Sequence, residues 1–152
     1  MLNRELVDRA LDLREAVADV QHWETELRLD PNKAPDAGLR DSVARLHSLA
    51  EEVRRVLEDA RQQLDFRLAG GSLGKTPEDL SLLKWSNVRD DTALWYARQR
   101  IELASKALRS LETRLVALQR SDVAGSDLVV ALAGTRLFGS VVAQQILAAA
   151  KE

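Results

Sequence analysis

The chain has 152 residues, enough for one domain with a substantial apolar core, and only 4% of them are aromatic. Its 22 Lys and Arg against 24 Asp and Glu give a formal net charge of −2, which provides no global attraction to nucleic acid or anionic lipid. The absence of cysteine excludes disulfides, thiolate metal sites and thiol catalysis.

Apolar residues spaced alternately four and three apart predict two long helices in the first half of the chain. The first should cover residues 2–29, with Glu24 as the one interruption of its apolar seam. Pro31 ends it, because proline disfavours helix at the preceding residue and lacks an N–H donor. The second should cover residues 37–68 with an unbroken seam, and Gly70 follows as a residue suited to a helix C-cap.

Three further helices are predicted in the second half, over residues 77–85, 91–120 and 127–150. Pro77 suits the first position of a short helix. Residues 86–90 either break that helix or carry it on into the next one, which has a third regular seam. The last helix differs because it is apolar almost all round, a pattern typical of a helix that is central in its bundle or covered by a partner.

The predicted fold is all-α, an antiparallel bundle of four long heptad-patterned helices plus one short helix, forming a single domain over residues 1–152. The most apolar run, residues 128–150, is interrupted by Arg136, Gln144 and Gln145, so no membrane span is expected. The first residues lead straight into a charged amphipathic pattern without the features of a signal peptide. The expected compartment is therefore the cytoplasm, or a particle assembled inside the cell.

Two sequence patterns suggest bound ligands, but each fits an ordinary structural role better. Residues 69–76 resemble a phosphate-binding loop, but that loop follows a strand, whereas these residues follow a long helix. Asp19 and His22 are three apart on one helix, as two metal ligands would be. A dimetal site needs further inward-facing carboxylates, and the seams here are apolar. No metal and no cofactor are therefore predicted.

Arg40, Asp41 and His47 resemble the arginine, polar residue and histidine of HEPN ribonucleases, which are small all-α proteins. In that family the arginine and histidine flank the scissile phosphate, usually across a dimer interface. The resemblance covers eight residues and implies an alternative function, a small RNA-cleaving or toxin-system protein with Arg40 and His47 as catalytic residues. The structural interpretation is that His47 lies at the flank of a seam.

Two groups of residues are candidates for binding a protein partner. Trp, Tyr and Arg dominate interface hot spots, and they gather at Trp85, Arg89, Trp95, Tyr96 and Arg100. The alternative is that these tryptophans pack the short helix onto the bundle. The second group places a small residue every four positions of the last helix, which lets another helix approach closely, at Ala131, Thr135, Gly139 and Ala143.

The predicted function is that of a non-enzymatic structural or interaction protein that acts by helix–helix docking. Its partner would be another protein or a second copy of the chain. The architecture fits a homo-oligomer, a small adaptor, or a minor component of a larger assembly such as a virus particle or a secretion machine. Nucleic acid is a disfavoured partner, because Asp90 and Asp91 lie within the aromatic and basic cluster.

Overall fold

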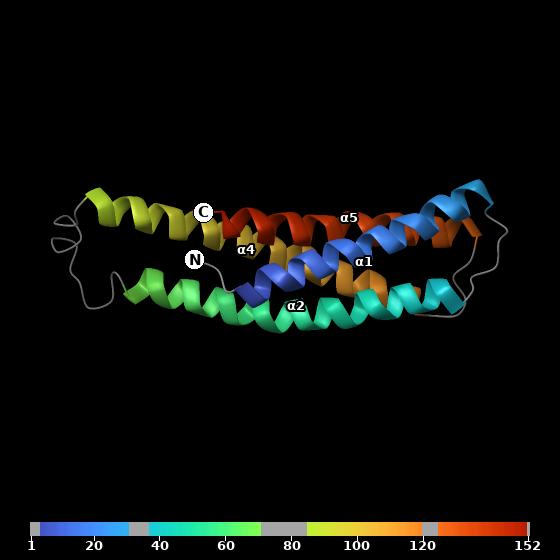
Figure 1. Cartoon of the computed structure of the whole chain (residues 1–152), viewed down its shortest axis with the longest axis horizontal. Helices are drawn as coiled ribbons and strands as arrows, with labels where there is room; N and C mark the ends of the chain where they lie inside the picture. Colours follow the sequence, from blue (N-terminus) through green and yellow to red (C-terminus); the bar gives the residue numbers. More distant parts are fainter. Residues whose placement is uncertain (1–3, 31–36, 71–84, 120–124, 152) are drawn as a thin grey trace.

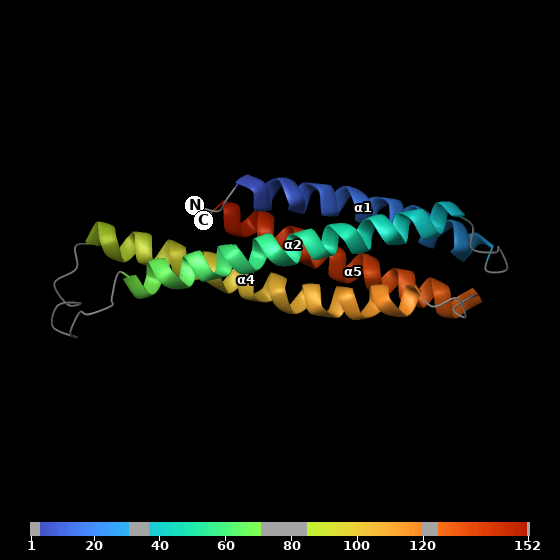
Figure 2. The same cartoon turned by 90° about the horizontal axis from the view of Figure 1, so that it is seen from below.

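Four long helices make up the part of the chain that the computed structural model describes, residues 4–30, 37–70, 85–119 and 125–151. In chain order they are α1 (Arg4–Leu29), α2 (Ala37–Gly70), α4 (Trp85–Leu118) and α5 (Gly125–Ala150). Figures 1 and 2 show them lying lengthwise in one elongated bundle. The predicted all-α bundle of packed helices is confirmed.

The start of α4 differs most from the predicted helix boundaries. The helix begins at Trp85, six residues before the predicted start at residue 91. Residues 86–90 contain neither proline nor glycine, so nothing in them stops the helix, and they are helical. The predicted short helix over residues 77–85 lies outside the described residues except for Trp85 itself. At the start of α5, Gly125 has a φ of 64°, a conformation that glycine adopts without strain.

The helices form a ring in which α1 packs against α2 and α5, and α4 packs against the same two helices. Within the described residues, neither diagonal pair of helices is in contact. Residue numbers that rise along one helix meet numbers that fall along its neighbour. Arg9 of α1 pairs with Glu52 of α2, whereas Asp19 pairs with Arg45. This arrangement lets every helix bury one side against two neighbours.

The buried residues of α1 and α2 follow the apolar spacing of the sequence, with Ala16 and Glu24 buried in addition in α1. In α2 the buried residues recur at alternating intervals of four and three, at Leu39, Val43, Leu46, Ala50, Val53, Leu57, Ala60 and Leu64. In α1 they are Leu6, Ala10, Leu13, Ala16, Val17, Val20, Glu24 and Leu27. Burying one such leucine contributes about 1.5–3 kcal/mol, so these lines of side chains hold the helices together.

The four helices are not of equal length. α2 and α4 have 34 residues each, and α1 and α5 have 26 each. The extra residues make α2 and α4 about 12 Å longer, at 1.5 Å per residue. Figure 1 shows both continuing on the left past the start of α1 and the end of α5. The bundle therefore has a four-helix body and a narrower end formed by α2 and α4.

Candidate functional site: the outer side of α5

A buried ion pair joins α1 to α5. Glu24 of α1 is only 4% exposed, and its carboxylate accepts hydrogen bonds from Arg136 Nε of α5 at 2.6 Å and from Arg28 Nη2 at 2.7 Å. A buried carboxylate is stable only when cations and donors compensate for lost water. Glu24 and Arg136 each interrupt an otherwise apolar sequence pattern, and the structure brings these two interruptions together.

The small-residue stripe of α5 lies inside the bundle. Thr135 and Ala143 are 0% and 1% exposed, Gly139 is also buried, and Ala131 is half-buried. A Cβ atom added at Gly139 would lie 2.6 Å from Val17 Cγ2 of α1, closer than such atoms can approach. The close approach that these residues permit is therefore made by α1 of the same chain, which leaves Thr135, Gly139 and Ala143 inaccessible to a partner of the folded bundle.

The opposite side of α5 carries exposed apolar residues. Val130 is 68% exposed and Leu137 is 54% exposed, and Gln144 continues the same seven-residue interval. Ala133 and Val141 lie between these positions and are half-buried. We call these five residues the α5 outer face. Exposed aliphatic side chains at this spacing form one stripe along the helix, which is the arrangement that a second helix packs against.

Arginines from α4 lie against α5 beside this face. Arg114 places its guanidinium carbon 4.9 Å from the centre of the Phe138 ring, a cation–π contact, and the same side chain lies against Gly134. Arg100 Nη1 donates a hydrogen bond to Gln145 Oε1 at 3.3 Å. These contacts hold two guanidinium groups along one edge of α5.

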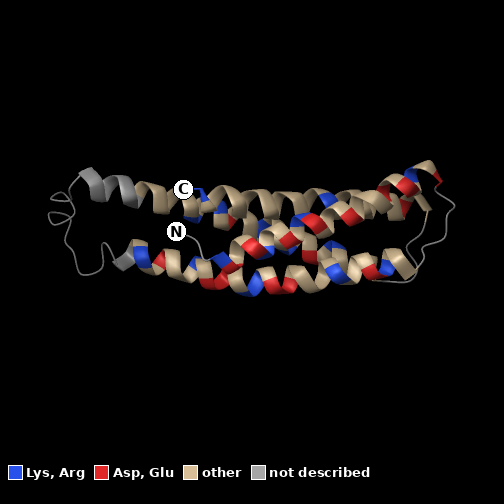
Figure 3. Cartoon of the chain, in the orientation of Figure 1, with Lys and Arg blue, Asp and Glu red and all other residues tan. Residues whose placement is uncertain are grey.

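Figure 3 shows how differently charge is distributed over the helices. Acidic and basic residues alternate along α2, whereas α5 is almost uncharged. α2 exchanges ion pairs with both of its neighbours, including Arg54 with Glu112 and Arg98 with Asp65 on the α4 side. The hydrogen bond from Arg98 to Asp65, together with the charge of that carboxylate, raises the pKa of Arg98 above its usual value. The α5 outer face thus carries no charged side chain, and two of its aliphatic side chains, Val130 and Leu137, are exposed.

The aromatic cluster predicted around Trp95 is only partly described. Trp95 and Tyr96 are 50% and 51% exposed and pack edge to face, with ring centres 5.5 Å apart. Trp85 and Arg89 belong to the first turns of α4, where side chains lie outside the described part of the structure. The structure therefore places Tyr96 and Trp95 on an accessible side of α4 and places Arg100 against α5.

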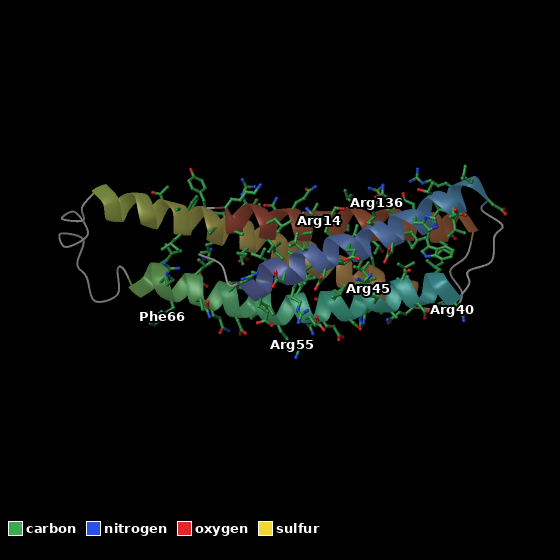
Figure 4. The ribbon with its side chains drawn as sticks, viewed as in Figure 1. Arg14, Arg40, Arg45, Arg55, Phe66 and Arg136 are labelled. Carbon is green, nitrogen blue, oxygen red and sulfur yellow. The ribbon has the colours of Figure 1, made fainter. Side chains whose placement is uncertain are left out.

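The candidate nuclease residues lie on one edge of α2. Arg40 is exposed and His47 is half-buried, and they are seven residues apart, a rise of about 10 Å along the helix. His47 Nε2 lies 3.9 Å from Glu51 Oε1. Figure 4 shows Arg40 pointing outward near the start of α2. Seven residues are close to two full turns, so both residues lie on the same side of α2.

The metal-ligand pair considered from the sequence has other contacts. Asp19 accepts a hydrogen bond from Arg45, and His22 packs edge to face on Trp23 with its Nε2 atom 3.9 Å from Glu26. In the described ranges, no group of three or more His, Asp or Glu is placed to hold a metal ion. The phosphate-loop resemblance falls mostly on residues 71–76, which lie outside the described residues.

Sequence reasoning did not single out Val130 or Leu137. Their signal is the seven-residue interval 130, 137 and 144 on the side opposite the small residues.

By length and composition α5 meets the criterion for a helix that crosses a membrane, with 33% of its most apolar window buried, and the core helix of a soluble protein meets the same criterion. The chain matches no protein-family model, no curated protein and no solved structure.

Proposed function

We propose that this chain is a non-enzymatic interaction protein that docks on another helix through the α5 outer face. It would act in the cytoplasm as a homo-oligomer or as a small component of a larger assembly. The observation that carries the proposal is the exposure of Val130 and Leu137 at 68% and 54% on a helix whose other side forms the core. Exposed aliphatic stripes of this kind mark protein contacts more often than catalytic sites.

The proposal treats the body as an antiparallel bundle with heptad-type seams. Two observations support this: buried residues recur at intervals of four and three, and rising residue numbers meet falling ones across neighbouring helices. A bundle of this kind is stiff along its length. It would present the α5 outer face as a straight, preformed surface, which reduces the entropy that a partner must lose on binding.

We further propose that α5 remains in the bundle and does not cross a membrane. The support is the contact of Arg136 with buried Glu24, at 2.6 Å. Moving α5 into lipid would separate these two charges and place Arg136 near the middle of an apolar segment, which costs several kcal/mol.

Site-specific photo-crosslinking in cells that make the protein tests this function. A photoreactive amino acid at Leu137 should form an adduct with a docked chain, and the same amino acid at Arg55, on the exposed side of α2, should not. Figure 4 shows Arg55 on the α2 side of the molecule. Adducts at neither position, or equally at both, would contradict docking through α5. Light scattering after size-exclusion chromatography then separates a homo-oligomer from a monomer that needs a different partner.

The nuclease alternative has less support, because it rests on an eight-residue resemblance alone. In the family that it resembles the site usually lies across a dimer interface, so this alternative would involve a second copy. RNA cleavage by the purified protein that is lost in His47→Ala would establish it. Cleavage that persists in His47→Ala would remove the assignment.

A further inference from the structure

The acidic residues of α1 are turned away from the α5 outer face. Asp19 and Glu15 lie 3.0 Å and 3.9 Å from Arg45 of α2. Val17 and Glu24, which contact α5, mark the other side of the helix. Residues three or four apart lie on the same side of a helix. Counting in such steps from Val17 and Glu24 therefore identifies the edge of α1 that lies along α5. Apart from Glu24 itself, that edge carries only neutral and basic residues, namely Val7, Leu11, Arg14, Ala18, Gln21, Thr25 and Arg28.

The same separation occurs on α4. Among its described side chains, the acids Glu102 and Glu112 face α2, where they lie 3.7 Å from Arg61 and 3.1 Å from Arg54. The edge of α4 that lies along α5 is marked by Arg100 through its bond to Gln145, and by Arg114 through its contact with Phe138. Steps of three and four residues along this edge again meet only neutral and basic residues, namely Tyr96, Arg100, Leu103, Ala107, Ser110, Arg114 and Ala117.

The surroundings of the α5 outer face are therefore positive, although the whole chain has a net charge of −2. Among the described residues of α5 and of these two edges, the acids are Glu24 and Asp127. Glu24 is buried between two arginines, and Asp127 lies in the first turn of α5. Arg14 and Arg136 lie on the side of α1 and α5 in Figure 4, opposite Arg55.

We propose that the α5 outer face binds an acidic amphipathic helix of a partner protein, an inference that rests on the proposed function and names the partner's chemistry. Val130, Leu137 and Gln144 repeat every seven residues, which matches the contact line of a helix lying alongside α5. Carboxylates flanking the partner's apolar line would meet Arg14 on one side and Arg114 on the other. Arginine pairs with carboxylates through two parallel hydrogen bonds, so such contacts would fix the partner's register.

Charge distinguishes this occupant from a second copy of the chain. Two copies joined through their α5 outer faces would bring Arg14, Arg100 and Arg114 toward the same arginines of the other copy. Like charges at an interface disfavour association. Membrane-surface helices also combine basic residues with an apolar side. The seven-residue interval of Val130, Leu137 and Gln144 favours a helix as the occupant, and binding to vesicles is kept as an outcome of the test.

Fluorescence anisotropy with two designed peptides tests the proposal. Each peptide is a fluorescein-labelled helix about three heptads long with leucine on its contact line. One carries glutamate at the flanking positions, and the other carries lysine. The full-length protein should bind the glutamate peptide at least about tenfold more tightly than the lysine peptide, and the difference should shrink as salt rises from about 0.05 to 0.5 M.

Two variants and two matched controls locate the binding surface. Leu137→Glu should weaken binding of the glutamate peptide at least about tenfold, because it places a like charge at the centre of the contact. The double variant Arg14→Glu with Arg114→Glu should remove most of the preference for the glutamate peptide. Phe66→Glu and Arg55→Glu change exposed residues of α2 and should leave both affinities unchanged. Circular dichroism of every variant verifies the helical fold.

Each contrary result has a distinct meaning. If both peptides bind equally and Leu137→Glu abolishes both interactions, α5 docks helices but the acidic preference is wrong. If neither peptide binds and light scattering shows a dimer that Leu137→Glu dissociates, the occupant is a second copy. If neither binds and the protein sediments with vesicles containing phosphatidylserine, the occupant is lipid. If neither binds, the protein is a monomer and vesicles leave it in solution, this inference is overturned, and the crosslinking at Leu137 separately decides the proposed function.

Discussion

α2 and α5 occupy opposite corners of the same four-helix ring, and they are held there by different interactions. α2 buries a continuous apolar seam and flanks it with ion pairs to both neighbours, such as Arg45 with Asp19 and Arg54 with Glu112. α5 buries small residues beside larger ones and has one buried ion pair among its described residues, between Arg136 and Glu24. Both helices are well packed inside, but only α5 leaves an apolar outer side.

The two helices differ in how their outer sides interact with water. The polar exterior of α2 needs no cover, since its exposed pairs are solvated and each contributes at most about 1 kcal/mol. The exposed side chains of the α5 outer face, Val130 and Leu137, gain nothing from water, whereas its half-buried Val141 packs against the core. The aliphatic, uncharged outer side of α5 therefore supports the proposed interaction with another molecule.

The largest expected effect separates the two sides of α5. Leu132→Ala should lower the free energy of unfolding by about 2–5 kcal/mol, because Leu132 is fully buried and its loss leaves a cavity. Leu137→Ala, five residues along the same helix, should change it by less than about 1 kcal/mol. Urea unfolding monitored by circular dichroism measures both. Similar losses from the two variants would mean that the outer face is part of the core.

The buried ion pair should have the next largest effect. Arg136→Leu should lower the free energy of unfolding by about 2–3 kcal/mol, because among the described residues Glu24 then keeps only Arg28, on its own helix, as a partner. The double variant Glu24→Leu with Arg136→Leu should recover to within about 1 kcal/mol of the unchanged protein, since no buried charge remains. A double-mutant cycle of unfolding free energies gives the coupling, and additive losses would show that the two residues act independently.

The two central glycines of α5 should respond in opposite ways. Gly139→Ala should destabilise by about 1–2 kcal/mol, because its Cβ would meet Val17 Cγ2 at 2.6 Å. Gly134→Ala meets only the flexible end of Arg114, at 2.7 Å, and should be neutral or stabilise by up to about 1 kcal/mol through helix propensity. Thermal unfolding of the pair tests this contrast. A stable Gly139→Ala protein would indicate a looser contact between α1 and α5.

The smallest effect is expected at the exposed ion pairs of α2. Arg45→Ala should cost less than about 1 kcal/mol, since its side chain is 46% exposed and its partners are solvated. The loss should diminish further in high salt, whereas the loss from Arg136→Leu should persist because its partner is buried. Unfolding at two salt concentrations compares the variants. If Arg45→Ala lowered the free energy of unfolding strongly and independently of salt, the ion pairs of α2 would not differ from the buried pair of α5.

The intervals of four and three predicted the helices and most core positions of α1, α2 and α4, because burial along a helix follows local periodicity. Leu39 and Leu64, at opposite ends of α2, are both buried as that rule requires. Periodicity does not specify which helix fills a given groove. It did not tell whether Gly139 faces a partner or α1, nor that Glu24 pairs with Arg136 across 112 residues. Such choices depend on tertiary packing, as does the exposure of Val130 and Leu137.

Because the helices have unequal lengths, the amide hydrogens of α2 are not equally protected from exchange along the helix. Its first turns lie against α1 and α4 together, whereas its last turns have passed the start of α1 (Figure 2). Amide hydrogens open to solvent more often where fewer neighbours must separate. Exchange with deuterium should therefore be slow around Leu46 and Val53 and faster toward Leu64. One continuous helix would then contain two opening units, a stable one within the body and a labile one at its tip.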